Sequence, residues 1–194
     1  MDAPLNSCWS FEIDSIERWA FAKNLFTSQE CDIIIQECKN YKMREGTTFG
    51  NSGDTFRKSN VVFITPVPEL TWVYQRLASS VVDINSKFFN FDLSGFNEGL
   101  QFTEYVAPDG KYDYHVDKTY KNVIRKLSIV IQLSDPEQYE GGEFHYLDSV
   151  EPEVLLKERG SLLAFPSWAM HRVTPVTKGT RYSLVGWVTG KPFK

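Results

Sequence analysis

The hydrophobic pattern changes its period near residue 95, and this change restricts the chain to very few folds. Beyond that point apolar residues alternate with polar ones, as in strands with one buried face. Turn sequences such as Pro108-Asp109-Gly110 and Asp135-Pro136 separate most of the segments. The expected strands cover residues 100–106, 112–117, 125–133, 142–147, 153–156, 161–165, 170–175 and 181–188. Short strands at this spacing predict a jelly roll, two antiparallel sheets packed as a sandwich.

The first half of the chain carries helical patterns that predict support for one of these sheets. Apolar residues at spacings of three and four predict helices over about 28–42 and 69–90. Thr27 with Glu30 predicts a capping box at the start of the first helix. Residues 61–64 are continuously apolar and predict a short buried strand between the helices.

The other N-terminal segments complete a single domain. Residues 1–26 alternate aromatic and polar residues, which predicts one or two strands added to a sheet edge. Residues 44–60 are rich in glycine and small polar residues and predict a mobile loop, either a solvated connector or a lid over a substrate. We expect one domain over 1–194, with helical, strand and loop support in 1–95 and the β core in 96–190.

Two residues on one expected strand, His115 and Asp117, predict a metal site. Residues two apart on a strand point to the same face, so both side chains can bind one ion. A His-x-Asp pair alone is a weak signal, because it arises by chance in many proteins. Two histidines and one carboxylate on one side of an octahedron leave open positions, and this donor set is typical of non-haem Fe(II) oxygenases.

The chain has only three histidines, so the third ligand is either His145 or His171. His145 alternates with Phe144 and Tyr146, which are the better candidates for the core face. We therefore expect His145 to be a partly exposed strand residue. His171 stands at the start of a strand and precedes a turn, and we predict that it completes the metal site.

A hairpin around Lys178-Gly179 is expected to join the last two strands. If its loop has an odd number of residues, His171, Val173, Arg181 and Ser183 share the inward face. Arg181 would then start roughly 13 Å along the strand from His171. A guanidinium there could clamp one carboxylate of a short dicarboxylate whose other end chelates the metal.

The composition restricts the kinds of partner that the protein can bind and the cellular compartment in which we expect it. A net charge of −4 and a pI near 5.4 argue against a dedicated nucleic-acid binder, which usually carries a basic face. Three cysteines without a CxxC pair predict buried thiols in a reducing compartment. No export signal stands in residues 1–10, and no apolar run approaches the ~18 residues of a membrane span. We expect a soluble, cytoplasmic protein without a membrane partner.

Six stretches of the chain carry a combination of motifs rather than isolated signals. They are residues 101–105, 112–117, 125–133, 139–143, 160–165 and 171–183. Together they resemble the 2-oxoglutarate- and Fe(II)-dependent dioxygenases, most of all their prolyl 4-hydroxylase-like branch. The resemblance covers about residues 24–190 and implies a double-stranded β-helix, the jelly roll expected from the strand pattern. It also implies Fe(II), 2-oxoglutarate and O2 as requirements, with ascorbate as a candidate reductant.

The resemblance implies roles for individual residues of these motifs. His115, Asp117 and His171 match the iron ligands, and Arg181 matches the residue that binds the distal carboxylate of 2-oxoglutarate. These four are the predicted catalytic residues. The other predicted cosubstrate-binding residues are Tyr105, Gln132, Ser183, Val173 and Leu127. Gln132 departs from the family pattern, because related enzymes carry a tyrosine at that position.

Three further residues are predicted to contact the substrate. Tyr112 and Trp187 align with aromatic residues that line the pocket, although ordinary core packing would explain both equally well. Arg57 lies in loop 44–60, which matches the flexible segment that covers the substrate in prolyl hydroxylases.

The leading functional prediction is hydroxylation of a prolyl residue in a protein or peptide, coupled to oxidative decarboxylation of 2-oxoglutarate to succinate and CO2. One alternative is hydroxylation of a free amino acid or another small molecule. Another is a cupin-like protein that binds metal without turnover. A nucleobase demethylase is disfavoured by the acidic balance of the chain. We expect a monomer or a homodimer.

Overall fold

Antiparallel strands are the main regular elements of the computed structural model, which describes residues 16–47, 56–119, 123–155 and 157–192. The helices are α1 (Ser28–Lys39) and α2 (Thr71–Ile84), with single turns η1 (Pro68–Leu70), η2 (Asn85–Phe89) and η3 (Pro136–Gln138). The strands are β1 (Ala20–Ala22), β2 (Arg44–Glu45), β3 (Arg57–Lys58), β4 (Asn60–Ile64), β5 (Leu93–Phe96), β6 (Leu100–Val106), β7 (Gly110–His115), β8 (Arg125–Gln132), β9 (Tyr139–Gly141), β10 (Phe144–Leu147), β11 (Glu153–Leu155), β12 (Leu162–Pro166) and β13 (Met170–Gly190). The predicted jelly roll is confirmed.

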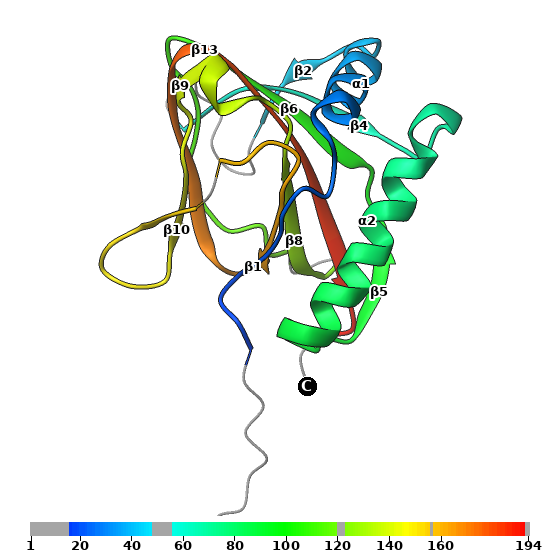
Figure 1. The fold of residues 1–194 in the computed structure, drawn as a ribbon. Helices are drawn as coiled ribbons and strands as arrows, with labels where there is room; N and C mark the ends of the chain where they lie inside the picture. The colour runs from blue at the N-terminus through cyan, green and yellow to red at the C-terminus, as the bar shows by residue number, and fades with distance from the viewer. Residues whose placement is uncertain (1–15, 48–55, 120–122, 156, 193–194) are drawn as a thin grey trace, which may run out of the picture.

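The strand β13 connects the two sheets and differs most from the sequence prediction. The predicted hairpin around Lys178-Gly179 is wrong, because residues 170–190 form one strand of 21 residues. Its first part pairs with β10, β7 and β9, and its second part pairs with β6, β8 and β5. Figure 1 shows the orange and red parts of β13 as opposite walls of a barrel. His171 and Arg181 therefore approach the interior from different sheets.

Two apolar cores lie on the two faces of the larger sheet, whose strands run in the order β1-β12-β8-β13-β6-β4-β2. The outer core is formed against α1 and α2, which cover this face in Figure 1. The inner core fills the barrel with side chains such as Tyr105, Phe144 and Phe165. Strand β8 serves both cores, because Ile129 and Ile131 point outward to the helices and Val130 points inward. The site lies on the inner face.

Most elements agree with the sequence pattern, and the departures lie at their ends. Thr27 and Glu30 form the predicted capping box of α1. The helix expected over 69–90 is divided into η1, α2 and the π-helical turn η2. The strand expected over 112–117 ends at His115, so Asp117 lies in the connection that follows.

Short strands at the sheet margins were not predicted, because two to four residues show no readable period. They are β2, β3, β5 and β9. β2 and β3 occupy the ends of the predicted loop 44–60, and the rest of that prediction falls on residues 48–55, outside the described residues. β1 pairs with the edge of β12, as expected for residues 1–26, of which residues 1–15 are not described.

The described cysteines and helices agree with the composition-based expectations. Cys31 and Cys38 are buried and unpaired. Burial raises the pKa of Cys31 to about 11 and that of Cys38 to about 12, which leaves both thiols unreactive at neutral pH. Among the described residues, every helix is too short or too polar to cross a membrane.

Gly179 provides a test of the bend in β13. Its φ is +72°, and an added Cβ would overlap the carbonyl oxygen of Gln138. We expect Gly179→Ala to lower the free energy of unfolding by about 1–3 kcal/mol, measured by chemical denaturation. Gly142→Ala is the matched control, because its φ of +59° is similar but its nearest neighbours are side-chain atoms that can shift. Equal losses would show that the backbone overlap is not decisive.

Candidate active site

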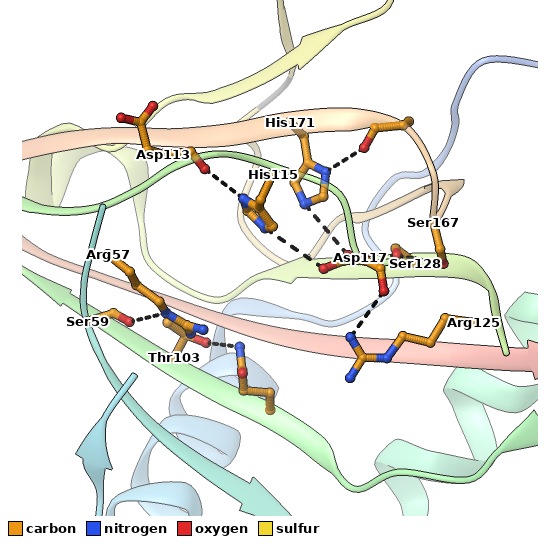
Figure 2. Close-up of polar contacts among 12 residues, drawn as sticks. Arg57, Ser59, Thr103, Asp113, His115, Asp117, Arg125, Ser128, Ser167 and His171 are labelled. Atoms are coloured by element: carbon orange, nitrogen blue, oxygen red, sulfur yellow. Dashed lines mark hydrogen bonds and ion pairs between the residues drawn. The ribbon is translucent and has the colours of Figure 1, made fainter. Parts of the chain in front are cut away.

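The structure brings the three predicted ligands together in the barrel. His115 ends β7, Asp117 follows two residues later, and His171 pairs with His115 in the antiparallel register of β13 and β7. One ligand atom from each side chain lies within 4.8 Å of those from the other two. Figure 2 shows the three side chains converging, with Asp117 carboxylate oxygens 3.9 Å from His115 Nε2 and 3.6 Å from His171 Nε2. This geometry suits one ion with three protein ligands.

Backbone carbonyl groups fix the orientation of both imidazoles. His115 Nδ1 lies 2.7 Å from the carbonyl oxygen of Asp113, and His171 Nδ1 lies 2.9 Å from that of Ala169. A carbonyl oxygen only accepts, so each Nδ1 carries the proton and donates it. Each Nε2 then keeps its lone pair for a metal ion, the usual division of roles in metal-binding histidines.

Two serines hold the carboxylate of Asp117 from the side of β8. Ser128 Oγ donates to Asp117 Oδ2 at 2.8 Å, and the Ser128 and Ser167 hydroxyls share a hydrogen bond of 3.0 Å. Both serines are fully buried. Sequence reasoning missed this pair, although a hydroxyl between Leu127 and Ile129 on an otherwise apolar strand was a usable signal.

Burial and mutual proximity set the protonation states of His115 and Asp117. Burial, together with the nearby His171, lowers the pKa of His115 to about 3. Burial alone would raise the pKa of Asp117, but His171 and His115 outweigh it, and the pKa falls below its usual value. The site therefore holds a neutral imidazole and an ionised carboxylate, the forms that bind metal ions.

On the inner side of the triad, the pocket ends at the buried guanidinium of Arg181. Arg181 is 3% exposed, and its Nη1 has no hydrogen-bond partner among the described residues. Its guanidinium carbon lies 5.5 Å from the centre of the Tyr105 ring. Val173 and Ser183 line the same pocket, as the shared inward face predicted. The unpartnered Nη1 and the buried charge of Arg181 favour an anion in this pocket, because a buried charge without a counter-ion is costly.

Two of the predicted cosubstrate-binding residues lie elsewhere. The prediction for Leu127 is wrong, because this side chain packs in the outer core against the helices, whereas Val130 on the opposite face of β8 lines the pocket. Gln132 lines a smaller adjoining cavity with Arg181, and its Nε2 donates to the Tyr139 hydroxyl at 2.9 Å. Tyr139 was missed as a site residue, although it belongs to the motif 139–143.

Tyr139 supplies a hydroxyl close to where the family pattern has a tyrosine. Burial raises the pKa of Tyr139, while the positive charge of Arg181 acts in the opposite direction. The phenol therefore stays protonated and can donate a hydrogen bond. In this chain, Gln132 and Tyr139 together occupy the region beside the Arg181 guanidinium.

The outer side of the triad opens into a cleft of about 410 Å³, hereafter the outer cleft. All three predicted substrate-contact residues, Tyr112, Trp187 and Arg57, line it. The Tyr112 ring stacks on the His115 imidazole with centroids 3.4 Å apart. The guanidinium carbon of Arg57 lies 4.4 Å from the centre of the Tyr112 ring. These residues therefore link the metal site directly to the cleft.

Arg125 is a further residue of the outer cleft that sequence reasoning missed. Its guanidinium carbon lies 3.7 Å from the centre of the Trp187 ring, and Nε and Nη2 both donate to Glu98 at 2.6 Å. Nη1 also donates to the backbone carbonyl of Asp117 at 3.3 Å. Arg125 thus fixes the indole and the connection that carries a ligand. An arginine that begins a buried strand was the available signal.

His145 lies outside the triad, as predicted, but it is only 9% exposed rather than partly exposed. Its Nδ1 accepts from Arg172 at 3.3 Å, and its Nε2 lies 3.2 Å from a carboxylate oxygen of Glu143. Because neighbouring strand residues point to opposite faces, Phe144 and Tyr146 enter the inner core while His145 faces the other way.

The residues present fit an Fe(II) ion and a dicarboxylate. Two imidazole nitrogens and one carboxylate oxygen form the donor set of non-haem Fe(II) oxygenases. The unpartnered Nη1 of Arg181 faces the pocket that starts at His115 and His171. A planar guanidinium suits bidentate binding of a carboxylate. His115, Asp117 and His171 would hold the ion, and Arg181 would hold the far end of the dicarboxylate.

The serine contact to Asp117 can be tested by metal binding alone. Loss of a hydrogen bond to a ligating carboxylate typically lowers metal affinity 10- to 100-fold. We expect Ser128→Ala to weaken Fe(II) binding about 10-fold, measured by anaerobic calorimetry. Ser161→Ala is the control, because this buried hydroxyl has no hydrogen-bond partner among the described residues. Equal effects of the two substitutions would assign the loss to general destabilisation.

Comparison with known families agrees with this geometry. The model of the 2OG-Fe(II) oxygenase superfamily matches residues 100–189. A PKHD-type hydroxylase of Klebsiella pneumoniae is 31% identical over 150 residues, which are 73% of this chain and 64% of that protein. A PKHD-type hydroxylase of Synechococcus sp. is 40% identical over 82 residues, 41% of this chain and 37% of that protein. The chain thus spans less than two thirds of the length of these relatives.

Solved structures with a similar fold include two prolyl hydroxylases. A Pseudomonas putida prolyl-4-hydroxylase has a TM-score of 0.73 at 20% identity, over 90% of this chain and 94% of that chain. A Trichoplax adhaerens prolyl hydroxylase, in complex with a peptide fragment of the hypoxia inducible factor oxygen degradation domain, has a TM-score of 0.76 at 16% identity, over 89% of this chain and 84% of that chain. Residues 100–189 are therefore similar to the 2OG-Fe(II) oxygenase superfamily, and the chain has the double-stranded β-helix fold of these two prolyl hydroxylases.

Proposed function

We propose that the chain is an Fe(II)- and 2-oxoglutarate-dependent hydroxylase that acts on a prolyl residue of a protein or peptide. One observation carries the proposal. A His-Asp-His triad and the buried Arg181, whose Nη1 has no partner among the described residues, line one pocket. A metal-binding protein without turnover needs the triad, but it has no need of a buried cation that awaits an anion.

Each residue has a defined task in the proposed reaction. His115, Asp117 and His171 bind Fe(II), which supplies O2 activation coupled to oxidative decarboxylation of 2-oxoglutarate to succinate and CO2. Arg181 binds the distal carboxylate of the cosubstrate and so orients its 2-oxo acid end towards the triad. Tyr105 is fully enclosed beside Arg181, and burial raises the pKa of its hydroxyl, which therefore stays protonated as a hydrogen-bond donor.

Apolar walls keep water from the pocket that joins the triad to Arg181, hereafter the inner pocket. Val173 and Phe144 line it, and Val130 and Val185 close the side of the larger sheet. Ser183 adds one hydroxyl on the same wall as Arg181. A dry pocket strengthens the interaction between a carboxylate and a guanidinium, because less water competes for either group.

The outer cleft is the proposed place of the organic substrate. Tyr112 and Trp187 offer aromatic walls for a proline ring, and Arg57 offers hydrogen-bond donors. A prolyl substrate is supported by the fold of the two prolyl hydroxylases, one of which is seen with a peptide. A cleft of about 410 Å³ also lies in the range of small-molecule sites, so a free amino acid is the second candidate.

A screen of prolyl peptides and free amino acids tests the substrate class. We would incubate the Fe(II)-loaded chain with 2-oxoglutarate and look for an added oxygen atom by mass spectrometry. Oxidised peptides would support the leading candidate, and oxidised amino acids alone would support the second. The effect of ascorbate, the cytoplasmic location and the monomer or homodimer state stay predictions.

Substitution of His171 and of His145 distinguishes an enzyme from a protein that only binds metal. We expect His171→Ala to abolish both Fe(II) binding and succinate formation, because two protein ligands hold the ion too weakly. His145→Ala is the matched control and should retain both, because the ring nitrogens of His145 face Glu143 and Arg172 and not the triad. Fe(II) binding by calorimetry and succinate by chromatography measure the outcome. Succinate formation by the His171→Ala variant would remove this residue from the metal site.

Arg181 offers an independent test of the cosubstrate. We expect Arg181→Ala to raise the 2-oxoglutarate concentration needed for half-maximal turnover at least ~10-fold, as the loss of a charge-assisted bidentate contact implies. Fe(II) affinity should stay near normal, since Arg181 is not a ligand. Arg181→Lys keeps the charge but loses the planar fork of the guanidinium. Its 2-oxoglutarate requirement should therefore lie between those of the unsubstituted chain and of Arg181→Ala. An unchanged 2-oxoglutarate requirement in the alanine variant would exclude the proposed clamp.

A further inference from the structure

A second buried arginine in this region has a guanidinium nitrogen without a hydrogen-bond partner among the described residues. Four buried side-chain nitrogen or oxygen atoms have no hydrogen-bond partner in the described part of the chain, and they belong to Arg57, Ser161, Arg181 and Trp187. Arg181 is accounted for by the cosubstrate of the proposed function. Arg57 is 7% exposed, and its Nη2 is the unpartnered atom. It lines the outer cleft and not the inner pocket.

Contacts on its other sides hold the Arg57 guanidinium in place. Nε donates to Ser59 Oγ at 2.8 Å, and the guanidinium carbon lies 4.4 Å from the centre of the Tyr112 ring. Figure 2 shows the group beside Ser59 and Thr103, below the triad. The Arg57 guanidinium is therefore oriented before a ligand binds, and this lowers the entropy cost of binding.

Among the described residues that line the outer cleft, none supplies a carboxylate to Arg57. The described acidic residue that lines the cleft is Asp117, which the triad and Ser128 already engage. Arg125, the other guanidinium of the lining, is neutralised by its two contacts with Glu98. A backbone carbonyl of a ligand would satisfy the hydrogen bond of Arg57 but not its buried charge.

We propose that Arg57 binds a carboxylate of the organic substrate, separate from the carboxylates of 2-oxoglutarate. The inference rests on the proposed function and narrows its substrate class. Tyr112 connects the two positions, because its ring touches both Arg57 and the metal ligand His115. The carboxylate therefore lies close to the carbon that is hydroxylated. It is either the α-carboxylate of a free amino acid or C-terminal residue, or the acidic side chain of a residue next to the target.

Binding without turnover tests the inference. The chain would be loaded with Fe(II) and 2-oxoglutarate in the absence of O2, so that the Arg181 pocket is filled and nothing reacts. Calorimetry would then compare N-acetylproline with N-acetylprolinamide, and N-acetyl-Pro-Glu-amide with N-acetyl-Pro-Gln-amide. We expect at least one acid to bind about 10- to 100-fold more tightly than its neutral partner, the usual gain from a charge-assisted pair. The pair that shows the preference identifies the source of the carboxylate.

Substitutions assign the preference to Arg57. Arg57→Gln should remove it, and Arg57→Lys should retain part of it, because lysine keeps the charge but loses the fork. Lys58→Gln is the matched control, since it removes the same charge one residue away, where the side chain pairs with Asp109 at 2.7 Å. Unchanged 2-oxoglutarate binding by the Arg57 variants would show that the barrel is intact.

Three outcomes would overturn the inference. They are equal binding of acids and neutral partners by the unsubstituted chain, an acid preference that persists in Arg57→Gln, and no binding of either acid. A measurement of succinate formation distinguishes failure of the Arg57 inference from failure of the proposed function. If a neutral peptide drives succinate formation and no acid preference exists, only the Arg57 inference fails. If the acid preference exists but no substrate yields succinate, the proposed function fails and the Arg57 site stands.

Discussion

The pairing of His171 on β13 with His115 on β7 is the constraint on which the site depends. Antiparallel register places two imidazoles side by side on one face, and the ring nitrogens that face away are tied to backbone carbonyls. Asp117 needs no strand of its own, because the chain that leaves β7 carries it to the same point and Ser128 fixes its carboxylate. Three ligands thus follow from one strand pair and one serine on the adjoining sheet.

Because β13 is continuous, the same strand carries the metal ligand His171 and Arg181, the residue proposed to bind the carboxylate of the cosubstrate. Each half of the strand turns alternate residues to the interior, first from the smaller sheet and then from the larger one. The pocket-lining residues of β13 are His171, Val173, Arg181, Ser183, Val185 and Trp187. They are all odd-numbered, although register shifts on both sides of Val176 interrupt the period of two and turn Val176 itself into the inner core. A strand that stayed in one sheet would instead place Arg181 far from His171.

The alternation within each half of β13 explains which parts of the site the sequence could predict. Arg181 was placed on the inward face through a hairpin that does not exist, and it faces the pocket because the register shifts around Val176 leave it on the same side as His171. Leu127 was misplaced because β8 is buried on both faces, so apolar character cannot show which side meets the pocket. Ser128 and Gln132 mark the pocket side by their polarity. Tyr139 could not be placed, since β9 is too short to show a period.

Arg181 and Arg57, each with one unpartnered guanidinium nitrogen among the described residues, divide ligand recognition between the core and the margin of the fold. Arg181 comes from the strand that also carries His171, so the cosubstrate end cannot shift without disturbing the metal site. Arg57 comes from β3, a two-residue strand that pairs only with β7 at the edge of the smaller sheet. Substitutions there leave the barrel pairing intact. The barrel therefore fixes the chemistry, while a short marginal strand can change which substrate is presented to it.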